Sequence, residues 1–317
     1  MAAIDCRVVW PELDYSTLRP TMDTLQRWAQ IVGKVRLAQS PWVNHSWHAT
    51  FYVSVRGLTT ALVPHGGRAF ELEFDLVAHA LVLRVSDGGE ARIALAPRSV
   101  AEFYAEVLET LAALGLPVAI DSRPNELPDA TPFPQDRAER AYDRGAAQRF
   151  WQALLQCDRV FKRFRTRFIG KCSPVHFFWG SFDLAVTRFS GRPAPLHPGG
   201  VPRLPDAVTR EAYSHEVSSA GFWPGSGDID YAAFYSYCYP APAGFAAATI
   251  APQAAQFNQE LGEFLLPYEA VRRAADPDAT LLSFLQTTYE AAANAGNWDR
   301  AALDIEEGRL GRPRPVG

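Results

Sequence analysis

Cysteine, methionine and long apolar runs are all scarce in this chain of 317 residues. The four cysteines are widely spaced and form no C-x-x-C pair, so reduced thiols are the simple interpretation. No stretch approaches the roughly 20 apolar residues that cross a bilayer, and we expect no membrane partner. The first residues, MAAIDCRVVWPELD, lack the apolar core of a signal peptide. The sequence therefore predicts a cytoplasmic protein.

An excess of positive charge is also missing. The formal net charge is −4, which argues against general nucleic-acid binding. With 48% hydrophobic and 21% charged residues, the composition is that of an ordinary globular chain with one large domain or two packed ones. The motifs G-x-G-x-x-G, G-x-S-x-G and H-E-x-x-H are absent. The sequence thus identifies no cofactor, and the oligomeric state stays open.

One long motif occurs twice. The run GKVRLAQSPWVNHSWHATFYVSVRG at residues 33–57 is similar to GKCSPVHFFWGSFDLAVTRFSG at residues 170–191. Both contain Gly-Lys at an expected helix end, then Ser-Pro, a His, a Trp, a strand-forming run and an Arg before a Gly. The alignment stays open, because either the tryptophans or the histidines can be matched. Two copies of one unit commonly face each other across a cleft, which is the first place to look for function.

Apolar periodicity predicts an α+β fold of two pseudo-symmetric halves, each a helix, an antiparallel β-meander and a further helix. In the first half we expect a helix before Gly33, strands at residues 48–60, 69–76, 80–85 and 91–95, and a helix at 99–114. In the second half we expect a helix before Gly170, strands at 175–189, 213–222 and 232–239, and helices at 252–264 and 279–295.

Proline-rich segments suggest where the halves divide. We expect a first α+β half at residues 1–122, a linker at 123–135, a second α+β half at 136–303 and a tail without fixed structure at 304–317. A further proline-rich excursion at residues 193–205 lies inside the second half. Loops of that length are either functional or disordered.

Four segments carry a resemblance to a known family: QIVGKVRLAQSPWVNHSWHATFYVSVRGLTT, FRTRFIGKCSPVHFFWGSFDLAVTRFSGR, AYSHEVSSAGFWPG and FYSYCYP. The chain resembles a family of uncharacterised bacterial proteins catalogued as a domain of unknown function. The similarity extends from Trp10 to about Leu303. It implies a soluble bacterial protein and offers no catalytic residue to transfer.

Asp183 is the leading candidate for a functional residue. On one continuous strand, alternation places Asp183 beside Ser181, with Trp179 further along the same face. A single acid among small residues between aromatic rings is typical of a pocket wall. The alternative is a buried acid that pairs with an arginine and holds the halves together.

Three further residues are candidates for proton transfer or ligation: His176, His215 and Glu216. The two histidines and one carboxylate could together form a divalent metal site. However, adjacent residues on a regular strand point to opposite faces, so His215 and Glu216 cannot both bind one metal there. Histidines with purely structural roles are the default, and whether a metal binds stays unknown.

Other candidates would bind a ligand. An anionic group would be held by Arg56, Arg188 or Lys171, and the aromatic and polar walls would come from His45, His48, Trp179, Ser181, Tyr213 and Trp223. Alternation on residues 234–239 places Tyr235, Tyr237 and Tyr239 on one face. Three hydroxyls that each need a partner favour a wet or ligand-lined face over simple packing.

The leading hypothesis is an uncharacterised cytoplasmic small-molecule enzyme or binder. Its aromatic, acid- and histidine-lined pocket would lie at or near the interface of the halves. The alternative is a non-catalytic interaction or scaffold protein, in which the same motifs are structural and exposed aromatic rings form a partner surface. Neither the reaction nor the substrate can be assigned from the sequence.

Overall fold

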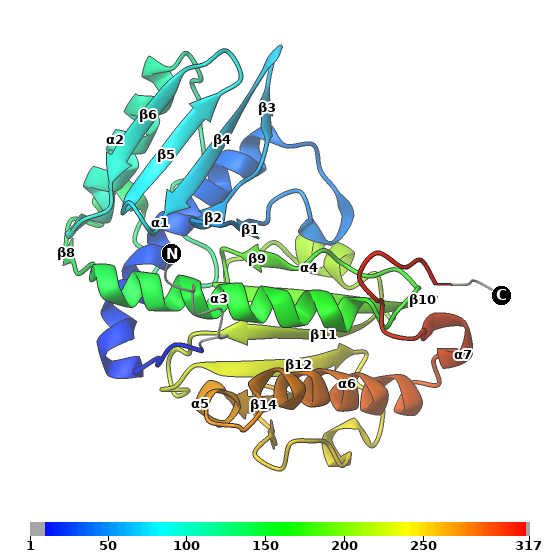
Figure 1. Cartoon of the computed structure of the whole chain (residues 1–317). Coiled ribbons are helices and arrows are strands. Elements are labelled where there is room, and N and C mark those ends of the chain that lie inside the picture. Colours follow the sequence, from blue (N-terminus) through cyan, green and yellow to red (C-terminus); the bar gives the residue numbers. More distant parts are fainter. Residues whose placement is uncertain (1–9, 315–317) are drawn as a thin grey trace.

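A computed structural model describes residues 10–314 and confirms the α+β class (Figure 1). Two antiparallel sheets have six strands each, and a third pairs two short strands, β7 (Arg98–Ser99) and β8 (Glu139–Arg140). A single hydrophobic core runs through both larger sheets and their helices.

The first sheet has the order β1-β2-β4-β5-β6, with β3 pairing to β4. Its strands are β1 (Tyr52–Val53), β2 (Gly57–Thr59), β3 (Val63–His65), β4 (Arg68–Asp75), β5 (Ala80–Val85) and β6 (Glu90–Ala94). Helices α1 (Tyr15–Gln39) and α2 (Val100–Ala113) pack on it. Phe103 of α2 stacks between Trp28 of α1 and Phe74 of β4, with ring centroids 4.6 and 6.5 Å away. Ser99 and Glu102 cap the start of α2 reciprocally, as a capping box.

The second sheet has the order β13-β14-β12-β11-β10-β9. Its strands are β9 (His176–Phe178), β10 (Asp183–Pro193), β11 (His215–Trp223), β12 (Ala233–Tyr239), β13 (Gln256–Asn258) and β14 (Glu263–Pro267). The helices are α3 (Arg144–Arg165), α4 (Asp206–Ala212), α5 (Tyr268–Arg272), α6 (Pro277–Ala295) and α7 (Arg300–Leu303). Three short 3-10 helices are η1 (Asn44–Ser46), η2 (Phe133–Gln135) and η3 (Phe245–Ala247).

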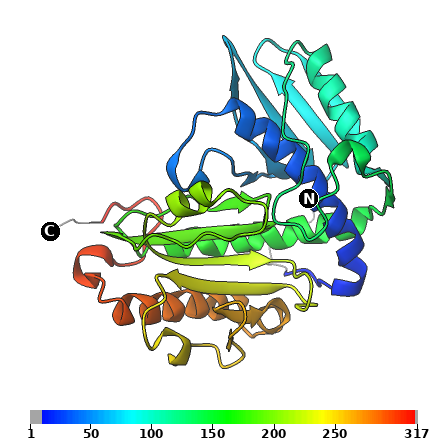
Figure 2. The ribbon, with the colours of Figure 1, turned by 180° about the vertical axis from the view of Figure 1, so that it is seen from behind.

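The two faces of the second sheet have different covers. Helices α3 and α6 lie on one face, where phenylalanines of α3 such as Phe150 and Phe161 pack on Phe222 and Phe234 of the strands (Figure 1). On the opposite face, α4 and the loop before it cross in front of the strands (Figure 2). Loops cover this face instead of an apolar helix, so polar side chains can point into it.

Helix α1 connects the two halves. The side chain of Gln26 donates to the carbonyl of Gly180 in the second half (2.8 Å). Gln30 forms hydrogen bonds with both the N–H and the C=O of Asn125 (2.7 Å each). The edges of the two sheets also meet, because Phe51 and Phe177 exchange two backbone hydrogen bonds of 2.8 Å. The division into domains stays a prediction.

Several strand and helix predictions are confirmed, notably β4, β5, β12, α2 and α6, but three are wrong. Residues 175–189 form a hairpin, β9 and β10, because the chain turns at 179–182 and Phe182 has a positive φ of 62°. Residues 48–60 are interrupted by a turn after β1. The helix at 252–264 is instead the β13–β14 hairpin, in which the side chain of Asn258 accepts two turn N–H groups and Gly262 has a φ of 70°.

Each half begins with a long helix that strands follow, but in the second half α4 lies between β10 and β11, and α5 precedes α6. The repeated Gly-Lys pairs also differ. Gly33 and Lys34 lie inside α1, so the expected helix end is wrong there, whereas Gly170 and Lys171 follow the end of α3. A Cβ at Gly33 would overlap the indole ring of Trp179, which explains the glycine by close packing. Internal duplication and pseudo-symmetry therefore stay predictions.

Candidate functional site

Asp183, the first residue of β10, lies on the loop-covered face of the second sheet and is 6% exposed. The hydroxyls of Ser181 and Tyr235 both donate to its carboxylate. Tyr235 belongs to β12 and reaches across β11, because Gly221 has no side chain in its path: a Cβ there would overlap the tyrosine hydroxyl. The local sequence thus builds a two-donor cradle for one carboxylate.

No arginine pairs with Asp183 in the described chain. Arg56 binds Asp75 of the first sheet (2.5 Å). Arg188 lies on the helix-covered face, where its guanidinium is fully buried over the rings of Phe164 and Tyr289. Burial lowers the pKa of Arg188 to about 10. The structure therefore brings neither of the two arginines predicted to bind an anion to the Asp183 face.

The charge of Asp183 acts on two other carboxylates, Glu126 and Glu263. Burial and the charge of Asp183 raise the pKa of Glu126 to about 7, and the same two causes raise the pKa of Glu263 to about 7. Burial also raises the pKa of Asp183, against its two hydrogen bonds. Within residues 10–314, no lysine or arginine forms an ion pair with any of the three. We call Glu126, Asp183, Tyr235 and Glu263 the Asp183 cluster.

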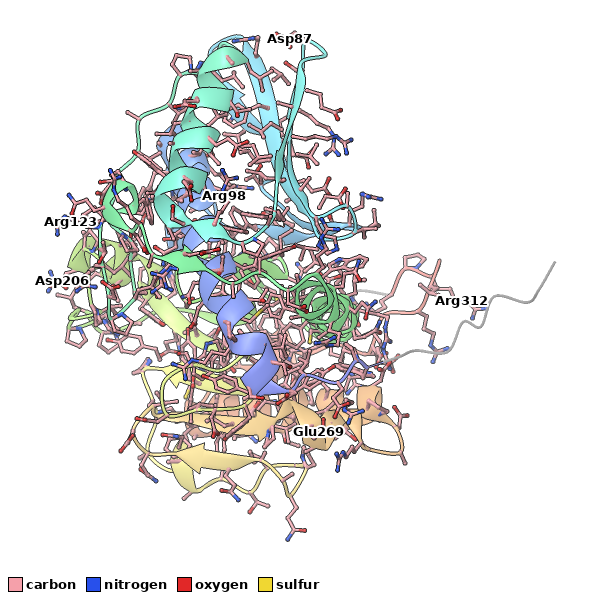
Figure 3. All side chains as sticks on the ribbon, turned by 90° about the vertical axis from the view of Figure 1, so that its left-hand side faces the viewer. Asp87, Arg98, Arg123, Asp206, Glu269 and Arg312 are labelled. Atoms are coloured by element: carbon pink, nitrogen blue, oxygen red, sulfur yellow. The ribbon has the colours of Figure 1, made fainter. Side chains whose placement is uncertain are left out.

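Glu126 reaches this face from a loop that α1 holds in place. Lys34 donates to the side chain of Asn125 (2.5 Å), next to Glu126, which has a positive φ of 57°. The carboxylate of Glu126 lies directly over Gly180, where a Cβ would overlap it. On the other side, Arg203 donates to the carbonyl of Leu127, so the loops before η2 and before α4 touch. Figure 3 labels Arg123 on the first of these loops and Asp206, the first residue of α4, at the end of the second. The strained backbone is therefore fixed from both sides.

A second hydroxyl network extends the polar face. The hydroxyls of Tyr213 and Tyr237 are 2.9 Å apart, and Tyr237 also bonds to Ser219, whose hydroxyl is 2.9 Å from that of Thr187. Burial and the hydrogen bond to Tyr213 are among the causes that raise the pKa of Tyr237 well above its usual value. These tyrosines are therefore neutral at physiological pH and act as hydrogen-bond donors and acceptors.

The other predicted acid–base residues are not brought together. His176 is fully buried between Trp47 and Phe178, at centroid distances of 6.3 and 4.7 Å. The ring of His215 lies by Ser214, while Glu216 forms an ion pair with Arg192 (2.6 Å). Among residues 10–314, no group of three or more His, Cys, Asp or Glu side chains is arranged to hold a metal ion.

Most remaining predicted ligand-binding residues lie at the junction of the halves. His45 and His48 are buried in and after η1, Trp179 donates its indole N–H to the carbonyl of Ala49 (2.7 Å), and Lys171 contacts His45. Trp223, half-buried at the end of β11, shares the face of Gly221 by alternation. Of the predicted set, Ser181 and Asp183 belong to the loop-covered face together with Tyr213, Trp223 and His176, which pairs with Ala185 of β10.

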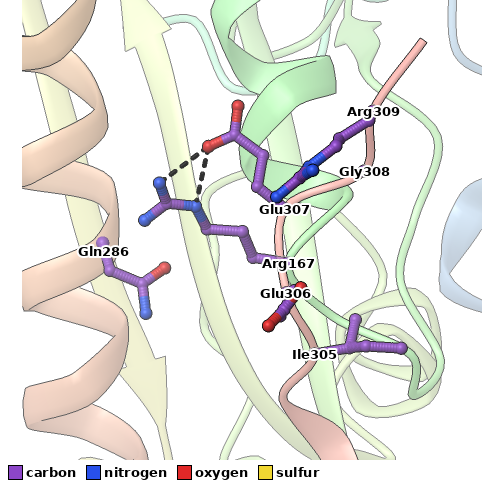
Figure 4. Close-up of a pocket in the computed structure, with 7 residues that line it drawn as sticks. All are labelled: Arg167, Gln286, Ile305, Glu306, Glu307, Gly308 and Arg309. Carbon is purple, nitrogen blue, oxygen red and sulfur yellow. Dashed lines mark hydrogen bonds and ion pairs between the residues drawn. The ribbon is translucent and has the colours of Figure 1, made fainter. Parts of the chain in front are cut away.

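Two open hollows lie away from this face. One of about 580 Å³ and a neighbouring one of about 400 Å³ are lined by α3, α6 and residues 305–309. In the first hollow, Arg167 and Glu307 form an ion pair of 2.7 Å beside Gln286 (Figure 4). Arg167 is already neutralised by Glu307, Arg309 also lines this hollow, and neither hollow includes a residue of the Asp183 cluster.

Sequence reasoning missed two carboxylates, Glu126 and Glu263. Glu126 falls in the predicted linker, and Glu263 falls in a segment that the sequence predicts as a helix. No local pattern marks either residue, because each reaches Asp183 only through the tertiary fold. Tyr235 had a signal, since the tyrosine alternation on β12 indicates hydroxyls that need partners.

The comparisons with known proteins identify the family. A family model described as "Family of unknown function (DUF5996)" matches residues 10–305, so the chain belongs to that family. No curated protein and no solved structure matches the chain. Among the helices of residues 10–314, none has the length and apolar character that a membrane crossing requires.

Proposed function

We propose that this member of the DUF5996 family is a small-molecule enzyme that transfers protons with the Asp183 cluster. The observation that carries the proposal is a pair of carboxyl groups, Glu126 and Glu263, whose pKa values are raised to about 7 by burial and by the charge of Asp183. A general acid or base works best when its pKa is close to the working pH. Structural carboxylates are instead normally paired with cations.

The ligand would carry hydroxyl or amine N–H groups. The site offers carboxylate oxygens, the hydroxyls of Tyr213 and Tyr237, and aromatic ring faces, while no lysine or arginine of the described chain forms an ion pair with its carboxylates. Asp183, fixed by Ser181 and Tyr235, would orient the ligand. Glu126, on a loop, would exchange the proton.

The alternative, a protein-interaction surface made of exposed aromatic rings, has less support. Tyr235 is only 8% exposed, and its hydroxyl is used by Asp183. Tyr213 and Tyr237 are half-buried and bonded to each other. A partner surface would need these rings to be free.

A parallel conversion assay tests the proposal. Wild type and the double variant Glu126→Gln/Asp183→Asn would be incubated with a mixture of small alcohols, polyols and amines, and consumption would be followed by mass spectrometry. We expect at least one compound to be consumed by wild type and by the control Glu71→Gln, from the paired face of the first sheet, but not by the double variant. Equal consumption by all three proteins, or none by wild type, would contradict an acid–base role.

A further inference from the structure

Basic side chains gather where the two repeated motifs meet. The tryptophan of the first motif, Trp47, is their common neighbour: its ring centroid is 5.4 Å from the Lys171 amine, 5.4 Å from the His45 ring and 6.3 Å from the His176 ring. We call His45, Trp47, Lys171 and His176 the Trp47 cluster. Phe189, near the far end of β10 from Asp183, adds an aromatic wall 4.6 Å from the Lys171 amine.

The hydrogen bonds define the protonation of the outer part of this cluster. The Nδ1 atom of His45 lies 2.7 Å from the carbonyl of Ala212, which can only accept, so Nδ1 carries the proton. The Nε2 atom then accepts from the amine of Lys171 at 2.6 Å. Lys171 is exposed and uses one of its three N–H groups for this bond, so the others are available to a ligand.

Several buried nitrogen atoms in and around the Trp47 cluster have no hydrogen-bond partner in the described chain. Arg36 is 7% exposed, and it donates Nε to the carbonyl of His48 (2.6 Å), but its Nη1 has no acceptor in the described chain. His176 is fully buried, and neither ring nitrogen has a partner among residues 10–314. Nε2 of His48 and Nε of Arg165 are likewise without partners there.

These nitrogens share one electrostatic environment. Burial and the charges of Arg165 and Arg36 lower the pKa of His176 to about 3, so both guanidinium charges act on its ring. No carboxylate of residues 10–314 forms an ion pair with either arginine; Glu211 affects only the outer histidines, His45 and His48. A buried guanidinium without a counter-charge is costly, and buried donors are normally satisfied.

We propose that this junction binds an oxyanion, the phosphate or carboxylate group of a small molecule, held by Arg36, His176 and Lys171. Its oxygens accept from the open Nη1 of Arg36, from the neutral imidazole of His176 and from the free N–H groups of Lys171. Charge-assisted hydrogen bonds of this kind are the strong ones, and arginine suits both phosphate and carboxylate geometry. The site lies on the same face of the second sheet as the Asp183 cluster, because His176 pairs with Ala185, two residues along β10 from Asp183, but it uses different residues.

Titration calorimetry in a chloride buffer tests this, with inorganic phosphate and succinate as separate probes for the two sources. We expect saturable binding of one of them with a Kd below about 1 mM, and Lys171→Gln to weaken it by about tenfold or more. Arg36→Lys should weaken it further. Arg56→Gln, which removes an arginine that already has its own carboxylate, is the control and should bind normally.

Two results would overturn the oxyanion site. One is wild-type protein that binds neither probe saturably at concentrations up to about 10 mM. The other is unchanged affinity in Lys171→Gln, an exposed substitution that decides the question even if Arg36→Lys does not fold. Because the readout is binding of simple anions, its failure leaves the proton-transfer proposal on the Asp183 cluster intact, and the reverse holds as well.

Discussion

The carboxylates of the two large sheets differ in whether a cation neutralises them. On the first sheet, Glu73 and Asp75 of β4 are neutralised by Arg84 and Arg56, at 2.9 and 2.5 Å. On the second sheet, the carboxylates of the Asp183 cluster form no ion pair in the described chain, and Asp183 accepts from two hydroxyls instead. The first arrangement is typical of structure, whereas the second keeps charges close together at a cost that a fold does not need.

The difference appears in the directions of the pKa shifts. Burial alone would raise the pKa of Asp75, but the hydrogen bond from Arg56 and backbone N–H donors lower it below its usual value. The pKa values of Glu126 and Glu263 are instead raised to about 7 by burial and by Asp183. Carboxyl groups on the two sheets thus have pKa values shifted in opposite directions, because an arginine neutralises Asp75 and no cation of the described chain pairs with Glu126 or Glu263.

The largest expected effect is on the pH dependence of stability. Between about pH 4.5 and 7 the folded state binds more protons at Glu126 and Glu263 than the unfolded state, so the free energy of unfolding falls as the pH rises. We expect a loss on the order of 5 kcal/mol for both groups together between pH 5 and 8, from urea denaturation. Glu126→Gln or Glu263→Gln should each remove part of this slope.

Glu269→Gln is the matched control for that measurement. The hydrogen bond from Arg272 holds the pKa of Glu269 below its usual value, so its contribution changes only at acidic pH. It should leave the slope between pH 5 and 8 as in wild type. If the free energy of unfolding of the wild type does not change between pH 5 and 8, the carboxylates of the two sheets do not differ in pKa in this way.

Exchanging one carboxylate on each face gives the next largest contrast. Asp75→Asn should lower the free energy of unfolding at pH 8 by about 2 kcal/mol, because it removes a charge-assisted hydrogen bond from Arg56. Asp183→Asn should change it by less than about 1 kcal/mol, since the lost hydrogen bonds are offset by relief of repulsion with Glu126 and Glu263. Equal destabilisation of both variants would make Asp183 a structural residue.

The smallest expected effect on stability comes from giving the Asp183 cluster a cation of its own, as the carboxylates of the first sheet have. Ser181 is exposed and bonded to Asp183, so Ser181→Arg would place a cation beside the cluster, as Arg56 does for Asp75. We expect a gain in stability of about 0.5 kcal/mol at pH 8 and low salt, measured by thermal unfolding. The gain should disappear in about 1 M NaCl, where the pair is screened. A loss of stability at low salt would contradict the picture of unpaired charges.

Local patterns predicted the regular elements well. Strands β4 and β5 alternate strongly, and α2 combines an apolar stripe with a capping box, so short-range physics is enough to form them. The β9–β10 and β13–β14 hairpins were missed although their turns contain Gly180 and Gly262, because a lone glycine is also compatible with a bulge in a strand or with a position inside a helix. The turn at residues 179–182 is held by the hydrogen bond from the side chain of Gln26 to the carbonyl of Gly180, two residues that are distant in sequence.

The candidate site divides in the same way. Asp183 stood out because small and aromatic residues surround it in the sequence, and its bond to Ser181 is local. Its partners Glu126, Tyr235 and Glu263 come from a loop and two other strands, so their approach depends on sheet register and on the anchoring of the loop by α1.

The sequence alone determined the α+β class and the main strands and helices, and it singled out Asp183 as a candidate, because these depend on periodicity and on neighbours along the chain. Only the tertiary structure decided which charges are neutralised. Arg188 lies on the helix-covered face, and Arg56 forms an ion pair with Asp75. As a result, Asp183 has no arginine partner, and Nη1 of Arg36 has no acceptor in the described chain. Pairing of charges depends on distances in space, and those are set by how sheets, loops and α1 pack together.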